Sequence, residues 1–331
     1  NPLLWAHPRG VLRLRGRSDA AIEAYAQARA CGADDPVVRE AEVGALIDAL
    51  RCDLAFERAE SLVGDHPEHF GGHTTLAELR WDDGPDAGRD SALTPFREAV
   101  ARRPDSRELA LSLVSLLLET HQAGEALERL QRLRREADHP TLVAMQANAL
   151  QALGRHDEAA AAYAEADGAL GATDVHFANA YVRHLLTAGE WAAAARRAEA
   201  ALAIAPEHQE TWAYLATAWR LTQDPREDWL CGFDRFVELM PVDVPRGFAS
   251  MPAFLDALRE GLDALHQARN EPVRQSVRGG SQTPGRLFGR ADARIAALEA
   301  ALTATIERFI ARLPKDETHP FLRRAARSVR Y

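Results

Sequence analysis

The stretch Asp174–Pro206 reads DVHFANAYVRHLLTAGEWAAAARRAEAALAIAP and is the clearest copy of a repeat that fills most of the chain. Its second half carries alanines at Ala194, Ala198 and Ala201, at spacings of four and three residues. That spacing places all three on one face of a helix, where another helix can approach closely. Gly189 falls in the expected turn before this helix, as Gly154 does in the preceding unit, and the closing proline blocks its continuation. The stretch therefore predicts a pair of helices.

The same pattern recurs along the chain at a period near 34 residues. The first small residue recurs at steps of 37, 34, 33 and 35, at Ala55, Ala92, Ala126, Ala159 and Ala194. Four residues later stand Ala59, Phe96, Leu130, Tyr163 and Ala198, and three further on Leu62, Ala99, Leu133, Ala166 and Ala201. Several units end in proline, at Pro67, Pro104, Pro140 and Pro206. Units beginning near Pro36 and His69 carry insertions, notably Asp82–Asp90.

This period and layout resemble the tetratricopeptide repeat (TPR) over about residues 8–240, in six or seven units. Such units cannot bury their apolar faces alone, so the resemblance implies a mainly α fold in which helix pairs stack into a right-handed superhelix with a concave groove. The expected partner is a peptide or protein in that groove.

The first helix of each pair is expected to line the groove. The predicted partner-binding residues are Asn148, His176, Asn179 and Arg183. Asn179 and Arg183 lie one turn apart and would point the same way, and donors at that spacing can grip a carboxylate or a peptide backbone. An ordinary solvated helix surface is the alternative.

Composition narrows the class of protein. The chain is 47% apolar and 27% charged, as is typical of a soluble globular protein, and its longest apolar run, Leu109–Leu118, is too short to span a bilayer. Cys31, Cys52 and Cys231 lie far apart without a C-x-x-C pair, which favours a reducing, cytoplasmic location. A nucleic-acid partner is disfavoured because the repeat region is acidic and no aromatic-basic strand motif occurs.

Charge is distributed unevenly. Residues 272–331 hold 12 Lys/Arg against 5 Asp/Glu, which is +7, so the total of -9 leaves -16 on residues 1–271. Lys315 is the only lysine. The arginine bias is explained most simply by a GC-rich genome. The alternative interpretation is that the basic tail faces anionic groups, such as a dicarboxylate cosubstrate or acidic surfaces of the chain's own array.

The repeat pattern breaks after Met240. Trp229, Phe233 and Phe236 are expected to pack the end of the array against the next domain, and Pro241, Pro245 and Gly247 mark a linker. Helices are predicted over 252–268, with Leu255 among its apolar-face residues, and over 291–313. Between them, Glu271–Thr283 has short-strand character around 273–277 and Gly-rich turns. A further extended segment is expected from His319.

Residues 212–331 also resemble a second family. The motifs, in order, are WRL at 219–221, DPR at 224–226, WL at 229–230, LH at 265–266, QSVRGGSQT at 275–283, LF at 287–288, LP at 313–314 and HPF at 319–321. Together they are similar to bacterial proteins that couple TPRs to a 2-oxoglutarate/Fe(II) oxygenase domain. The resemblance implies an array over 1–240, a linker over 241–250 and, over 251–331, the N-terminal portion of an α+β double-stranded β-helix (cupin-like) domain. It further implies a hydroxylase that uses Fe(II) and 2-oxoglutarate.

The iron site that this resemblance implies is not complete in the sequence. Such an oxygenase needs two histidines and a carboxylate, usually begun by H-x-D/E on a strand. No H-x-D occurs, and the three H-x-E matches begin at His66, His156 and His208, at helix ends or turns of the array. The ligands are therefore expected beyond Tyr331, and no metal or catalytic residue is assigned.

Five tail residues are candidates for lining a substrate or cosubstrate pocket: Arg274, Gln275, Arg278, Gln282 and Thr283. The alternative is that they only shape the first strand and turn, and His266 and His319 are expected to be structural. The rival to the enzyme hypothesis is a non-catalytic interaction scaffold with a C-terminal cap. A repeat-bearing glycosyl- or sulfotransferase is disfavoured because Arg278–Ser281 is a poor match to a nucleotide-binding turn.

Overall fold

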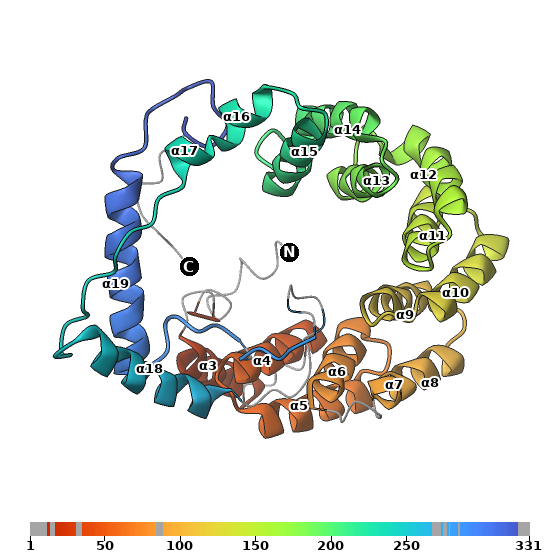
Figure 1. Cartoon of the computed structure of the whole chain (residues 1–331). Coiled ribbons are helices and arrows are strands. Elements are labelled where there is room, and N and C mark those ends of the chain that lie inside the picture. Colours follow the sequence, from red (N-terminus) through yellow and green to blue (C-terminus); the bar gives the residue numbers. More distant parts are fainter. Residues whose placement is uncertain are drawn as a thin grey trace. The chain divides into compact units, whose positions relative to one another are not determined.

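The structure is a computed structural model that describes residues 12–13, 17–30, 35–83, 89–266, 273, 277, 279–283 and 285–323. Every regular element within these ranges is a helix (Figure 1). Val273 lies in a turn and Val277 in irregular backbone, while 274–276 fall outside the described ranges. The residues from His319 to Phe321 form a bend and a turn. The mainly α fold is therefore confirmed, whereas no strand of the predicted β-helix occurs within the part of the chain that the structure describes.

The helices alternate as first and second members of pairs. The first members are α4 (Pro36–Asp48), α6 (Phe70–Asp83), α9 (Arg107–Glu119), α11 (Pro140–Ala152), α13 (Val175–Thr187) and α15 (Gln209–Leu221). Their starts are 34, 37, 33, 35 and 34 residues apart. The second members are α5 (Cys52–Asp65), α7 (Arg89–Ala92) with α8 (Thr94–Arg102), α10 (Ala123–Glu136), α12 (His156–Leu170), α14 (Trp191–Ile204) and α16 (Arg226–Cys231), and α3 (Ser18–Ala30) precedes the first pair. The chain is thus a TPR-like helical array, and no helix of the described residues has the length and hydropathy to cross a membrane.

Local chemistry fixes where the pairs begin and turn. Asp174 accepts hydrogen bonds from the backbone N of His176 at 2.9 Å and of Phe177 at 3.1 Å, which satisfies free N–H groups at the start of α13. In the five pairs whose turn the structure describes, the chain reverses through one residue of left-handed backbone. This residue is Leu50, His121, Gly154, Gly189 or Gln223, with φ of 58, 61, 73, 81 and 57°. The predicted turn glycines at 154 and 189 are therefore confirmed, and three other units place a side chain in the same conformation.

The predicted packing seam is also confirmed. All fifteen residues of the three repeated positions are buried except Leu133, which is half-buried. Alanine dominates the seam of the Asp174–Pro206 unit, where Ala194 and Ala198 pack with Val182 and with Leu215 and Trp219 of α15. Small side chains here allow close approach of the helices, and the bulkier neighbours fill the remaining space.

The chain divides into two compact units. The first comprises Asn1–Leu116, Val242–Thr305 and Tyr331, and the second Leu117–Pro241 and Ile306–Arg330. This division follows spatial contacts rather than the predicted boundaries at 240 and 251, which stay predictions.

In the first unit, the C-terminal helices add a core of their own. Phe254 and Leu258 of α18 (Met251–Leu265) pack on Ile295 of α19 (Ala293–Ile310). Both predicted helices therefore form: α18 begins one residue before the predicted 252 and ends three before 268, and α19 lies within the predicted 291–313. Leu255, predicted on the apolar face of α18, is instead 51% exposed.

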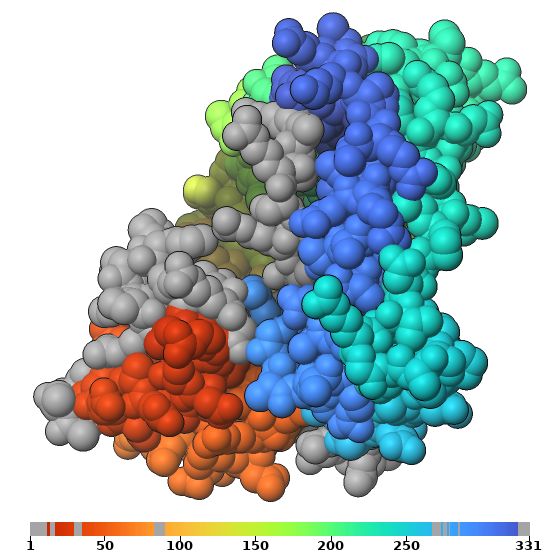
Figure 2. Space-filling view, turned by 90° about the vertical axis from the view of Figure 1, so that its left-hand side faces the viewer, coloured from red at the N-terminus to blue at the C-terminus, as the bar shows by residue number. Residues whose placement is uncertain are grey.

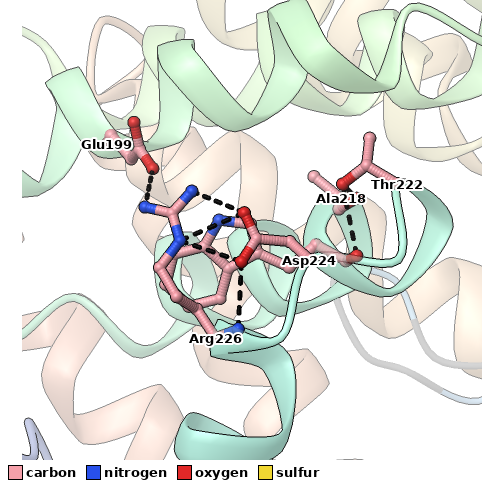
Figure 3. Close-up of polar contacts among 6 residues, drawn as sticks. Glu199, Ala218, Thr222, Asp224 and Arg226 are labelled. Carbon is pink, nitrogen blue, oxygen red and sulfur yellow. Dashed lines mark hydrogen bonds and ion pairs between the residues drawn. The ribbon is translucent and has the colours of Figure 1, made fainter.

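In the second unit, an arginine fixes the turn into α16 (Figure 3). Arg226 donates to Asp224 Oδ2 at 2.6 Å and to Glu199 Oε1 of α14 at 2.9 Å. Its guanidinium also lies 4.6 Å from the ring centroid of Trp219. These contacts fix the start of α16, which has only six residues. The second helices α5, α10, α12 and α14 have 14 or 15 residues.

Residues 311–323, here called the strap, cover the end of this short helix. His319 is 3% exposed, and its Nε2 donates to the carbonyl oxygen of Leu230 at 3.0 Å. Its Nδ1 accepts from the backbone N of Phe321 at 3.2 Å and of Leu322 at 3.3 Å. Because Nδ1 accepts while Nε2 donates, the geometry requires the neutral Nε2–H tautomer. His319 is therefore structural, although it sits in a turn rather than at the start of a strand.

Aromatic rings surround this histidine. The ring centroids of Trp229 and of Phe236 in α17 (Phe233–Phe236) lie 5.1 and 5.5 Å from that of His319. The expectation that Trp229 and Phe236 pack the array's end is met, but Phe233 is 54% exposed beneath Arg220.

Arginines tie the C-terminal segment to acids of the same unit. Arg312 of the strap, just after α19, donates to Glu238 Oε1 at 2.8 Å, and Figure 2 shows the end of α19 beside the segment that carries Glu238. Arg323 lies 3.5 Å from Glu207. In the second unit, the basic tail thus faces acids of its own array.

Candidate peptide-binding face

The first helices of three consecutive pairs line one side of the second unit. In Figure 1, α11, α13 and α15 follow one another on this side, with α10, α12 and α14 on the other. Asn148 of α11 and Arg183 of α13 occupy equivalent positions, 35 residues apart. Asn148 is half-buried and Arg183 is exposed. The structure therefore brings two of the predicted residues to neighbouring helices of this face.

Tyr163 of α12 interacts with both Asn148 and Arg183. Its hydroxyl donates to Asn148 Oδ1 at 2.7 Å, and its ring stacks on Tyr181 with centroids 5.1 Å apart. Burial raises the pKa of Tyr163 to about 12, and the positive charge of Arg183 acts in the opposite direction. The phenol thus stays neutral and keeps its proton for Asn148.

A second tyrosine approaches Arg183 from α15. The Tyr214 hydroxyl donates to Glu210 Oε1 at 3.1 Å. Burial and then the Glu210 carboxylate raise the pKa of Tyr214, while Arg183 again lowers it. Arg183 therefore interacts electrostatically with Tyr163 of α12 and with Tyr214 of α15. No carboxylate pairs with Arg183 within the described residues, whereas Arg197 of α14 pairs with Asp167.

Asn179 has a different position from the one expected of a groove residue. It is 2% exposed, and its Nδ2 donates to Glu210 Oε2 at 3.2 Å. Its Oδ1 accepts from the Thr211 hydroxyl at 2.8 Å. These bonds join α13 to α15, so Asn179 supports the face from below while Arg183 reaches solvent.

His176 lies at the edge of the same face. It is exposed, and its ring meets that of His208 edge-on with centroids 5.6 Å apart. The repeat pattern alone did not single out Tyr163 as a site residue, because it occupies a packing position, and it did not identify Tyr214 or Glu210. The only signal for these two was the four-residue spacing of Glu210 and Tyr214 along α15.

The second predicted set falls mostly outside the described residues. Arg274, Gln275 and Arg278 all do so. Thr283 Oγ1 contacts His266 Nδ1 at 3.4 Å, and the Ser281 hydroxyl contacts its Nε2 at 2.8 Å, so this stretch is bonded locally to the end of α18. Gln282 is half-buried. Among the residues that the structure describes, no group of three His, Cys, Asp or Glu side chains is placed to hold a metal ion.

Comparison with known proteins found no matching family profile and no matching curated protein. Among solved structures, a thermophilic TPR protein from Thermus thermophilus is 21% identical over 62% of this chain and 92% of its own, with a TM-score of 0.34. YrrB, described as a TPR protein with an unusual peptide-binding site, is 14% identical over 51% and 86%, with a TM-score of 0.35. Yeast Tom70 is 14% identical over 65% and 45%, with a TM-score of 0.49. All three TM-scores lie below 0.5, and the assignment of helix pairs rests on the chain's own spacing and burial.

Proposed function

We propose that this chain is a non-catalytic TPR-type scaffold that binds an extended peptide segment of a partner protein on the face formed by α11, α13 and α15. The observation that supports this most is Arg183, an exposed guanidinium without a carboxylate partner in the described residues, flanked by Tyr163 and Tyr214. Such a group offers several N–H donors in a fixed plane to a carboxylate or to backbone carbonyls.

The neighbouring residues add hydrogen-bonding groups for a peptide backbone. Asn148 has an amide N–H₂ that its bond to Tyr163 leaves unused, since that bond occupies Oδ1. Glu210 is held by Asn179 and Tyr214, so it can accept a backbone N–H from the peptide at the other edge of the face. An acidic side chain or a carboxylate on the peptide, placed over Arg183, would fix its register.

The test uses a random peptide library displayed on phage and selected against the intact chain. The enriched peptide is then measured by fluorescence anisotropy against wild type, Arg183→Ala and Arg196→Ala. Arg196 is the matched control, because it is an exposed arginine on α14, a second helix. We expect Arg183→Ala to weaken binding about tenfold, the usual scale for losing hydrogen bonds to a charged group, and Arg196→Ala to leave the Kd unchanged. Equal effects of the two variants, or a library with no enriched peptide, would refute the proposal.

The predicted hydroxylase activity is a separate hypothesis. No observation on the described residues supports it. It predicts succinate release that depends on both Fe(II) and 2-oxoglutarate. Succinate measured with each component omitted in turn tests it. That assay is independent of Arg183, so the two hypotheses can fail separately.

A further inference from the structure

Residues 237–241, here called the exposed segment, follow α17 without forming a helix. Val237 has extended backbone, with φ of −117° and ψ of 121°, and its N–H donates to the carbonyl oxygen of Phe233 at 3.1 Å. This bond closes α17. From 238 to 240, no backbone group bonds to another residue that the structure describes, and Figure 1 shows the chain leaving α17 as a ribbon without coils. The backbone here can therefore pair with that of another protein without prior unfolding.

The side chains of the exposed segment point alternately to two sides. Arg312 donates to Glu238 Oε1 at 2.8 Å and also lies 3.3 Å from Met240 Sδ. Leu239, between these two residues, is 99% exposed, and Val237 is 63% exposed. Such alternation is expected of extended backbone. Arg312 thus holds the segment by one side and leaves Leu239 free on the other.

This arrangement matches the form in which proteins bind an extended chain. Backbone hydrogen bonds supply affinity in that mode, and pockets for single side chains supply specificity. An endopeptidase places such a pocket beside the bond that it cuts, and an apolar pocket would accept Leu239. Bonds in a helix are protected because the helix must open before cleavage, whereas the exposed segment has no helix to open.

We propose that the exposed segment is a cleavage site for an endopeptidase with an apolar specificity pocket, and that the Leu239–Met240 bond is cut. The next bond is disfavoured, because Pro241 lacks an N–H group and has a restricted φ. In the reaction, water adds across the Leu239–Met240 amide. The C–N bond breaks, Leu239 acquires a carboxylate and Met240 acquires a free amine.

The cut changes how the strap is attached to the second unit. Glu238 and its partner Arg312 then lie on different products. The strap becomes part of a separate chain that only noncovalent contacts hold on the array, among them the bond from His319 to the carbonyl of Leu230. Its release then depends on concentration, which an intact chain does not allow. The exposed segment lies outside α11, α13 and α15, so this inference is independent of the proposed peptide binding.

The test is limited digestion of the intact chain with chymotrypsin, whose specificity pocket is a hydrophobic slot. Mass spectrometry gives the initial rate of cleavage after Leu239. A synthetic peptide of residues 237–245, blocked at both ends, gives the rate for the same bond in an unfolded chain. We expect the two rates to agree within about tenfold, because no unfolding step precedes the cut.

Leu255 is the reference within the molecule. It is 51% exposed, but it lies on α18 beside the buried Phe254. Cleavage after Leu255 requires this part of α18 to open, so we expect it to be at least about 100-fold slower in the intact chain than in a peptide of residues 252–260.

Two variants show whether Leu239 directs the cut. Leu239→Ala should slow cleavage at this bond about 100-fold, because the pocket loses its apolar side chain. Val237→Ala is the matched control: it also removes an exposed apolar side chain, and its rate should stay within about threefold of wild type. A rate after Leu239 more than about tenfold below that of the peptide, or equal effects of the two variants, would overturn the proposal.

Discussion

Replacing His319 by alanine tests whether the strap stabilises the second unit. The ring is 3% exposed and forms three hydrogen bonds, one to the carbonyl of Leu230 and two from backbone N–H groups of the strap. In the variant, water can satisfy the N–H groups of Phe321 and Leu322, since neither residue is buried. The Leu230 carbonyl belongs to a buried residue and loses its only side-chain donor from the strap.

The magnitude comes from these two losses. An unsatisfied buried carbonyl costs about 1–3 kcal/mol, and truncation of a buried ring costs roughly 2 kcal/mol more. We therefore expect the free energy of unfolding of the second unit to fall by about 3–5 kcal/mol.

Urea unfolding followed by tryptophan fluorescence is the assay, because Trp229 lies beside His319. His266→Ala is the control: this histidine is exposed and, among the described residues, its ring bonds to Ser281 and Thr283, so its loss should cost less than about 0.5 kcal/mol. A His319→Ala variant as stable as wild type, or two variants with equal losses, would show that the strap does not stabilise this unit.

Three further predictions concern single sites. Burial raises the pKa of Asp82 to about 6, so its contribution to stability is present below the unfolded value of 3.8 and is lost as pH rises through 6. Asp82→Asn should therefore stabilise the protein by up to about 3 kcal/mol at pH 7.5 and have little effect at pH 4. A difference between the two proteins in chemical denaturation that stays the same across that pH range would contradict this. Gly189→Ala should lower the free energy of unfolding by about 1 kcal/mol, because φ is +81° with open space around the Cβ, whereas Gln223→Gly should raise it by about 0.5–1 kcal/mol; thermal unfolding should show shifts of opposite sign. Burial, followed by the charge of His156, lowers the pKa of His184. The neutral form of this histidine, which is hydrogen-bonded to Gln151, therefore contributes stability that is lost as pH falls below 6.5. An NMR titration that places the pKa of His184 at or above 6.5 would contradict this prediction.

Packing made the array predictable. Helix pairs of one length must present small or apolar residues at the same places, so the sequence alone marks Ala159, Tyr163 and Ala166 as one seam. The turn glycines at 154 and 189 are predictable from the same register. Leu50 and Gln223 are not, because neither residue type favours a left-handed backbone, and the preference of histidine is too weak to single out His121.

Contacts between distant segments were not predictable in this way. The sequence places Arg183 on a groove helix, but its relation to Tyr163 and Tyr214 depends on how three pairs stack. It likewise gives no reason for His319 to lie on Leu230, 89 residues away. Asn179 illustrates the limit: its position on the helix was correct, but its side chain turns into the interface with α15, where Thr211 and Glu210 offer better-ordered partners than solvent.

The strap also carries the only lysine of this sequence, Lys315, which is exposed four residues before His319. Arginine side chains do not react with amine-directed dyes, so a fluorophore ester can modify only this side chain and the α-amino group. A dye on Lys315 would sit close to the tryptophans of the array's end and be quenched by them while the strap is docked. The scarcity of lysine, whatever its origin, thus makes strap detachment directly visible as an increase in fluorescence, without any engineered cysteine.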